Sequence, residues 1–447
     1  MSSQKVITRF APSPTGFLHA GNYRTALFCY ILARQNNGSF FVRIEDTDKA
    51  RSKKEYAENI LETLAWMGLS YDGEVVYQSA RTEKHKAYLK KLVDEGKAFV
   101  SKETPKEPGG RTEVIRFKNP NKKVTFHDLI RGDITFDTTE LGDFIIAKSF
   151  DEPVFHLAVV ADDFDMGITH VIRGEDHISN TPRHILIQEA LGAPTPIYSH
   201  VPLVLSPDRS KLSKRKGALP LTAYRDQGYL PEAVINFLAL VGWNPGTEQE
   251  LFTLEELIKE FKMERINKAG AIFNEEKLQW INKEYIKKIP ASEQTALLTK
   301  WAPKLTSLDA TTLSKLAPIV FERISTLSEI TQMSESSEFD YLLNAPSYMP
   351  EALLWKGKST KDESANHLSK AIELLSGLSE NTFDRTIVKE TVWAYAEGVG
   401  RGQLLWPMRY SLSGREKSPD PFILAELLGK KETLNRLTYA RDILLKK

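Results

Sequence analysis

The chain has 447 residues, of which 41% are hydrophobic and 27% charged, a composition typical of a globular protein with about three domains. Its 60 basic and 59 acidic residues leave a formal net charge of +1. This balance excludes a uniformly basic protein that coats nucleic acid, so any nucleic-acid contact must come from local patches. The single cysteine, Cys29, excludes an intramolecular disulfide framework and any metal site built from several cysteines. No apolar run approaches the ~18 residues of a membrane span and no leader-like segment is recognisable, so we expect a cytoplasmic protein without membrane contact.

Strand and helix patterns alternate along the first third of the chain. Residues 6–10 predict a short strand, and apolar residues at helical spacing predict a helix from Asn22 to a stop at Asn37–Gly38. Residues 39–44 predict the next strand, and helices are predicted over 53–69 and 82–95. A strand–helix–strand order with short connections predicts an α/β protein with a parallel, doubly wound sheet.

Residues 97–153 interrupt this rhythm and predict a small insertion between two halves of the sheet domain. Pro105, Pro108, Gly109 and Gly110 indicate a loop. Short β-like pieces are predicted after that loop, at 114–117, 124–126, 134–136 and 144–147.

The α/β rhythm returns after the insertion. Residues 154–161 are apolar at nearly every position, as in a buried parallel strand, and we predict a strand there. Further strands are predicted over 168–173 and 197–205, separated by a helix that begins at Thr181–Pro182. From about residue 218 the patterns are almost entirely helical, with a boundary near Pro290. The predicted domain limits are 1–96, 97–153, 154–217, 218–290 and 291–447.

The loop from Arg9 to Asn22 (RFAPSPTGFLHAGN) follows a strand and leads into a helix. Backbone N–H groups and the helix dipole therefore point at whatever lies above this loop. Gly16 and Gly21 allow a close backbone approach, and His19 can donate to phosphate oxygens. The loop lacks the Gly-Lys-Ser/Thr ending of a Walker loop. The alternative is a Pro/Gly connector with a helix-capping histidine, and His19 taken alone favours that alternative.

A second segment, Ser206–Gly217, follows the last predicted strand and carries five basic residues between Arg209 and Lys216. Ammonium groups at the C-terminal edge of a parallel sheet suit a triphosphate whose α-phosphorus gains negative charge during reaction. The alternative is a solvated basic loop, and if this segment is considered alone, that interpretation is favoured.

Together the two segments resemble the paired "HIGH" and "KMSKS" motifs of class I aminoacyl-tRNA synthetases. They stand here as His19-Ala20-Gly21-Asn22 and Lys211-Leu212-Ser213-Lys214-Arg215. The flanking segments RFAPSPTG, RIEDTD, THVIRGEDHISNTPRH and KLSKRKG are similar to those of bacterial-type glutamyl-tRNA synthetases. The likeness continues through FNEEKLQWIN, WPMRYSLSG and SPDPFILAELLGK, so it covers the chain nearly end to end.

The resemblance implies a split Rossmann-type sheet domain with a small insertion, followed by an all-helical C-terminal arm. It implies ATP-dependent ligation of L-glutamate to tRNA through a glutamyl-adenylate, with AMP and diphosphate released and Mg²⁺ bound to the ATP. Residues 1–96 and 154–217 would form the catalytic domain, 97–153 would bind the acceptor end, 218–290 would contact the stem and 291–447 would bind the anticodon. The expected partner is tRNA(Glu), with tRNA(Gln) left open, and the expected state is a monomer.

The resemblance also implies roles for individual residues. Arg9 and Arg173 would face the substrate's side-chain carboxylate, and Glu45 would bind its ammonium group. Two charge-assisted hydrogen bonds of ~1.5–3 kcal/mol each, partly lost to neutral glutamine, would discriminate by roughly 10²–10⁴. The full glutamate set is Arg9, Ala11, Ser13, Glu45, Phe155 and Arg173. The ATP set is His19, Gly21, Lys211 and Lys214, of which His19, Lys211 and Lys214 would be catalytic.

Three features depart from the family pattern. Phe155 stands in Pro153-Val154-Phe155 where the family usually has a tyrosine, so a phenolic contact to glutamate is absent. The insertion has no cysteine, so we expect no zinc and no protein-held metal. Lys148–Asp151 replaces the usual Arg-Ser-Asp-Gly turn.

Three alternatives fit less well. The paralogue that loads glutamate onto a queuosine base lacks the helical arm, and glutaminyl-tRNA synthetases carry Pro-Glu-Pro-Asn where this chain has Pro12-Ser13-Pro14-Thr15. A catalytically silent RNA-binding relative would not need His19, Gly21, Lys211 and Lys214, all of which are present.

Overall fold

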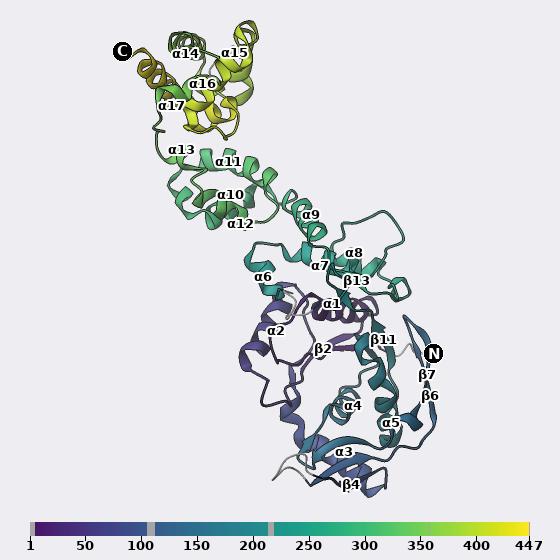
Figure 1. Cartoon of the computed structure of the whole chain (residues 1–447). Helices are drawn as coiled ribbons and strands as arrows, with labels where there is room; N and C mark the ends of the chain where they lie inside the picture. The colour runs from purple at the N-terminus through teal and green to yellow at the C-terminus, as the bar shows by residue number, and fades with distance from the viewer. Residues whose placement is uncertain (1–4, 105–111, 213–218, 357, 447) are drawn as a thin grey trace. The chain divides into compact units, whose positions relative to one another are not determined.

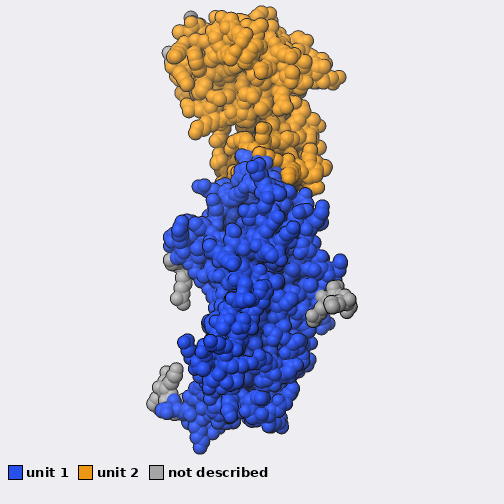
Figure 2. Space-filling model, turned by 90° about the vertical axis from the view of Figure 1, so that its right-hand side faces the viewer, with its two compact units in different colours: residues 1–285 blue, residues 286–447 orange. Residues whose placement is uncertain are grey.

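The computed structural model describes residues 5–104, 112–212, 219–356 and 358–446 (Figure 1). The chain forms two compact units, residues 1–285 and 286–447 (Figure 2). The predicted loop at 105–110 and the predicted ATP residue Lys214 lie outside the described residues.

A parallel sheet built from two parts organises the first unit. In the first part the strand order is β1 (Ile7–Phe10), β2 (Ser39–Ile44) and β3 (Val76–Tyr77), all parallel. In the second, β10 (His170–Gly174) pairs in parallel with β11 (Ile197–Val201). The parts meet where the Thr169 N–H donates to the Ile7 carbonyl at 3.0 Å. The predicted α/β class and the split of the sheet along the sequence are therefore confirmed.

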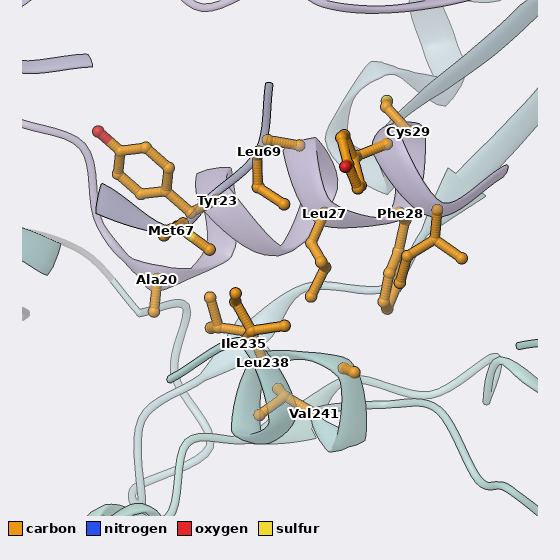
Figure 3. Close-up of a cluster of buried hydrophobic side chains, with 14 of the residues drawn as sticks. Ala20, Tyr23, Leu27, Phe28, Cys29, Met67, Leu69, Ile235, Leu238 and Val241 are labelled. Carbon is orange, nitrogen blue, oxygen red and sulfur yellow. The ribbon is translucent and has the colours of Figure 1, made fainter. Parts of the chain in front are cut away.

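One face of this sheet is covered by helices from both ends of the unit. Because side chains alternate along a strand, Phe10, Val42 and Ile172 turn to the same buried cluster. The cluster includes α1 (Ala20–Gln35), α2 (Lys54–Trp66), α7 (Pro231–Leu240) and α8 (Leu254–Glu260). In Figure 3, Leu27 of α1 lies above Ile235 and Leu238 of α7. The segment after residue 218 thus completes the core of the first half of the sheet.

The opposite face packs against a second cluster. Val171, adjacent to Ile172 and pointing the other way, joins Tyr198 there. The helices that cover this face are α3 (Thr82–Asp94), α4 (Phe155–Asp165) and α5 (Thr181–Leu191). Figure 1 accordingly shows α1 and α4 on opposite sides of β2.

The predicted strand over 154–161 is wrong, because Phe155–Asp165 form helix α4. Leu157, Ala158, Val160 and Ala161 are all buried, so the helix is apolar on nearly every side. A short, continuously apolar run does not distinguish a buried strand from a buried helix. The helix also extends beyond the end of the predicted strand, through the acidic residues Asp162, Asp163 and Asp165.

The insertion contributes to two sheets. Strands β4 (Ala98–Lys102), β5 (Glu113–Phe117), β8 (Phe144–Ser149) and β9 (Glu152–Pro153) form an antiparallel sheet in that order. The hairpin of β6 (Lys123–Asp128) and β7 (Gly132–Asp137) instead joins the parallel sheet, with Asp128 opposite Tyr198 of β11. The four β-like pieces are confirmed, but half of the insertion extends the main sheet.

The last predicted strand, 197–205, divides at Pro202. Its second part, β12 (Val204–Leu205), leaves β11 and pairs with β13 (Ala271–Ile272). In the chain, helix α6 (Leu221–Asp226) follows β12, and helix α9 (Glu275–Ile286) follows β13.

The second unit is built from helices, as predicted. Its core combines side chains of α14, α15, α16 and α17. In the described ranges, no helix is both long and apolar enough to cross a membrane. The helices are α10 (Ala291–Trp301), α11 (Ala310–Arg323), α12 (Ser328–Glu335), α13 (Asp340–Leu343), α14 (Lys361–Ser376), α15 (Arg385–Val399), α16 (Arg401–Ser413) and α17 (Pro421–Leu445).

Candidate active site

The main cavity of the first unit lies at the carboxyl ends of β1, β2, β10 and β11 and holds about 450 Å³. Ligands of open parallel sheets bind at this edge, where strand ends and helix starts converge. Every predicted site residue that the structure describes lines this cavity. These residues are Arg9, Ala11, Ser13, His19, Gly21, Glu45, Phe155, Arg173 and Lys211.

His19 caps the helix that begins at this cavity. Helix α1 starts at Ala20, two residues earlier than predicted, and the Gly21 N–H donates to His19 Nδ1 at 3.1 Å. A β-carbon at position 21 would lie 3.1 Å from the imidazole, so glycine lets the ring fold back over the helix start. Because Nδ1 accepts a hydrogen bond, the ring proton of the neutral imidazole is on Nε2. The helix-capping alternative is thus correct, and the same ring lines the cavity.

Lys211 follows β12 in the chain and lines the cavity. The backbone around it bridges to Leu205, and Pro220 bridges to His19. The Lys211 ammonium group lies 2.7 Å from Asp176 Oδ2, and both side chains are about half exposed. The lysine lowers the pKa of Asp176, against the opposing effect of burial. His19 and Lys211, almost two hundred residues apart in sequence, therefore share one cavity.

A buried cluster of four charges lies beside β1 and β2, and two of its members, Arg9 and Glu45, line the cavity. Asp163 Oδ1 accepts from Arg9 Nε at 3.0 Å and from Arg43 Nη1 at 2.7 Å, and Arg43 Nη2 donates to Glu45 Oε1 at 3.0 Å. All four side chains are buried. Burial raises the pKa of Glu45, whereas the two guanidinium groups outweigh burial at Asp163 and lower its pKa.

Arg173 is another buried cation that lines the cavity, and its hydrogen-bond partners are neutral groups. Nε donates to His200 Nε2 at 3.1 Å, Nη2 donates to Thr181 Oγ1 at 2.8 Å, and Nη1 lies 3.1 Å from His184 Nδ1. Burial lowers the pKa of Arg173 to about 10, and burial also lowers the pKa of both histidines. Together with the four-charge cluster, three cations face two carboxylates, so this group of five side chains carries one unbalanced positive charge. The buried Arg24, which also lines the cavity, donates instead to the backbone carbonyls of Pro202 and Val241.

Phe155 lies on the same side of the cavity as Arg173. Its ring centroid lies 5.4–5.7 Å from those of His156, His177 and His184. Burial lowers the pKa of His156 and of His177 to about 4. The aromatic side chain and these neutral imidazoles therefore make a wall without formal charge.

Sequence reasoning missed the residues that hold the predicted arginines in place: Arg43, Asp128, Asp163, His184 and His200 are not among the predicted site residues. The incorrect strand at 154–161 hid Asp163, because the helical spacing of Phe155, Val159 and Asp163 on α4 is what turns it toward the cavity wall. Within a continuously apolar run, that spacing does not distinguish a helix from a strand.

Among the residues that the structure describes, no group of three or more His, Cys, Asp or Glu side chains is arranged to hold a metal ion. The predicted absence of zinc stays a prediction.

Comparison with known proteins gives matches over both units. A family model described as tRNA synthetases class I (E and Q), catalytic domain, matches residues 5–108 and 104–280, and one described as anticodon binding domain matches 293–441. A glutamate–tRNA ligase of Thermodesulfovibrio yellowstonii is 40% identical over 98% of this chain and 99% of its own length. One from Francisella tularensis is 38% identical over 99% and 100%.

Solved structures give the same picture. A glutamate tRNA ligase from Elizabethkingia meningosepticum, crystallised with its amino acid, superposes with a TM-score of 0.87 at 32% identity, covering 98% of this chain and 99% of that one. The glutamate–tRNA synthetase of Elizabethkingia anophelis gives 0.84 at 31% identity, covering 98% and 100%.

Proposed function

Because the chain belongs to the class I tRNA synthetases for glutamate and glutamine, we propose that it is a glutamate–tRNA ligase. The reaction joins L-glutamate to ATP as a glutamyl-adenylate and then transfers the glutamyl group to tRNA, releasing diphosphate and AMP. The observation that carries the proposal is the cavity that brings His19 and Lys211 together with Arg9 and Arg173.

The amino acid would bind at the arginine wall. Its side-chain carboxylate would neutralise the unbalanced charge of Arg9, Arg43 and Arg173, and Glu45 would take the ammonium group. Ala11 and Ser13 line the same cavity. Glutamine would leave a buried cation without its anion, which a site of this kind rejects without editing.

ATP would bind between His19 and Lys211. The Nε2–H of His19 and the N–H groups at the start of α1 suit phosphate oxygens, with Gly21 leaving room for them. Lys211 would exchange Asp176 for the triphosphate, and Lys214 would supply a second ammonium group. The attacking carboxylate is already ionised, so the protein positions the reactants and stabilises the developing charge instead of removing a proton.

Mg²⁺ would enter with ATP, whose triphosphate charge it offsets. The described residues offer no three-ligand cluster, so we assign no protein ligand to it. The insertion, residues 97–153, has no cysteine, and we propose that the enzyme needs no zinc.

The tRNA would bind along the remaining parts of the chain. We assign the acceptor end to residues 97–153, the stem to 218–290 and the anticodon to 291–447. The match of an anticodon binding domain to residues 293–441 supports the last assignment. We propose a cytoplasmic monomer that charges tRNA(Glu), with tRNA(Gln) as the second acceptor to be tested.

The test is glutamate-dependent exchange of radiolabelled diphosphate into ATP, with and without tRNA(Glu), using glutamine as the control amino acid. We expect exchange with glutamate and at least a hundredfold less with glutamine. No exchange with glutamate under either condition would refute the proposed function. Aminoacylation of purified tRNA(Glu) and tRNA(Gln) side by side would then define the acceptor.

A further inference from the structure

Asp128 and His200 form a buried relay that ends on Arg173. His200 Nδ1 lies 2.7 Å from Asp128 Oδ2, and the backbone N–H of His200 donates to the same oxygen at 2.9 Å. Both side chains are completely buried. Neither residue lines the cavity. His200 meets the cavity lining at Arg173, and its Nε2 also lies 3.1 Å from Thr181 Oγ1.

The hydrogen-bond pattern determines which ring nitrogen of His200 carries the proton. Asp128 Oδ1 accepts from the N–H groups of Ile130 and Arg131, each at 3.0 Å. The carboxylate is thus surrounded by donors, and these bonds together with His200 lower its pKa against the effect of burial. An ionised carboxylate only accepts, so His200 must donate from Nδ1. Its Nε2 is then a lone-pair acceptor, and it receives the Nε–H of Arg173 at 3.1 Å.

The hydrogen bonds of Arg173 leave two of its N–H donors for a ligand. A guanidinium has five N–H donors, and three of them point to His200, His184 and Thr181. Two remain, one on each terminal nitrogen, which matches the two oxygens of a carboxylate. The plane of the guanidinium lies over the ring of Tyr198, with Cζ 5.4 Å from the ring centroid, so its orientation is limited from that side as well.

We propose that Asp128 and His200 are positioning residues for the amino-acid substrate: the Asp128–His200 pair orients Arg173 so that its two remaining N–H groups face the side-chain carboxylate. The inference rests on the proposed function. It gives the insertion a role in the amino-acid site, because Asp128 is the last residue of β6 and reaches His200 through the pairing of β6 with β11.

Two substitutions at position 200 separate the halves of the relay. The amide of His200→Asn reaches the place of Nδ1 and keeps a donor for Asp128, but it leaves Arg173 Nε without an acceptor. The longer His200→Gln places an amide oxygen near Nε2 and keeps the acceptor. The control is His170→Gln, which makes the same replacement at a partly buried histidine of the same sheet. His170 is on β10 and outside the cavity lining.

We expect His200→Asn to raise the KM for glutamate by about 10- to 100-fold, as for one lost charge-assisted hydrogen bond. The KM for ATP should change by less than about threefold. His200→Gln should recover most of the glutamate KM, and His170→Gln should match the wild type. Equal KM increases in the Asn and Gln variants, or an equal rise in the KM for ATP, would overturn the proposal.

A second measurement does not depend on the Asn variant folding. In wild-type protein labelled with ¹⁵N-histidine, the His200 ring, assigned by its loss in His200→Gln, should show the neutral Nδ1–H form at neutral pH. An Nε2–H tautomer or a charged ring would refute the inference even if the enzyme is active. Absence of exchange activity in the wild type would instead refute the proposed function, so the two failures are distinguishable.

Discussion

Replacing Arg173 with methionine tests the chemistry of the arginine wall. The guanidinium is 8% exposed and lines the cavity, and its protein partners are the neutral groups of His184, His200 and Thr181. Arg173→Met removes the charge and keeps a side chain of similar length. Because no carboxylate among the described residues forms a hydrogen bond or an ion pair with this cation, its loss should affect the substrate more than the fold.

The expected loss of substrate binding follows from the two remaining N–H groups. At ~1.5–3 kcal/mol for each charge-assisted hydrogen bond, their removal should lower kcat/KM for glutamate by roughly 10²–10⁴. The KM for ATP should change little, since Arg173 is on the amino-acid side of the cavity.

The effect on stability combines two opposing contributions. Burial lowers the pKa of Arg173 from 12.5 to about 10, which corresponds to a penalty on the order of 3 kcal/mol for the buried charge. The substitution removes this penalty but also removes three hydrogen bonds, at about 1 kcal/mol each. The two contributions nearly cancel, and the apparent Tm should move by only a few degrees.

Diphosphate exchange at saturating ATP and tRNA measures kcat/KM for glutamate. Thermal unfolding followed by circular dichroism measures the apparent Tm. Arg183→Met is the matched control, because Arg183 lies on α5, is partly exposed and does not line the cavity. A kcat/KM for glutamate within threefold of the wild type would refute the assignment of Arg173 to the substrate. A large fall in Tm with an equal loss of ATP binding would show that Arg173 acts mainly in folding.

Three further substitutions test other parts of the site. Lys214→Ala should lower the rate of adenylate formation by roughly 10²–10³ with tRNA affinity nearly unchanged. Single-turnover kinetics measure the rate of adenylate formation, and filter binding measures the tRNA affinity. An unchanged rate would show that Lys214 does not belong to the site. Phe155→Tyr should lower the KM for glutamate by about fivefold through one added hydrogen bond, and a KM that stays constant or rises would show that position 155 does not contact glutamate. Asp163→Asn should reduce the apparent free energy of unfolding by ~3–5 kcal/mol in a urea titration, because two buried guanidinium groups lose their shared anion. Asp94→Asn, in an exposed ion pair with Lys90, should cost less than about 1 kcal/mol; equal losses would contradict the burial argument.

The sequence by itself determined β1, β2, β10 and most helices of the first unit, because their side-chain patterns are local. Phe40, Val42 and Ile44 alternate with Phe41 in β2, and this two-residue period is readable without any tertiary information. The loop before α1 was likewise readable, since proline fixes its own φ and glycine permits backbone conformations that other residues avoid, whatever their surroundings. The segments around His19 and Lys211 carried the family resemblance, so the expected location of the cavity also came from sequence.

Only the tertiary structure decided the state of the apolar run at 154–161. A helix buried on all sides and a strand buried on both faces have the same composition, and packing against α3 and α5 selects the helix. The same holds for the hairpin β6–β7, whose pairing with β11 depends on a partner about seventy residues later.

Tertiary structure also decided which charges meet. Arg9 and Asp163 are 154 positions apart, and Asp128 and His200 are 72 apart. No local period encodes such a pair; it exists because the order of strands places the two side chains at one edge of the sheet. The sequence therefore determined which residue types the cavity would contain, and the fold determined which of them are neutralised by the protein and which are left for a ligand.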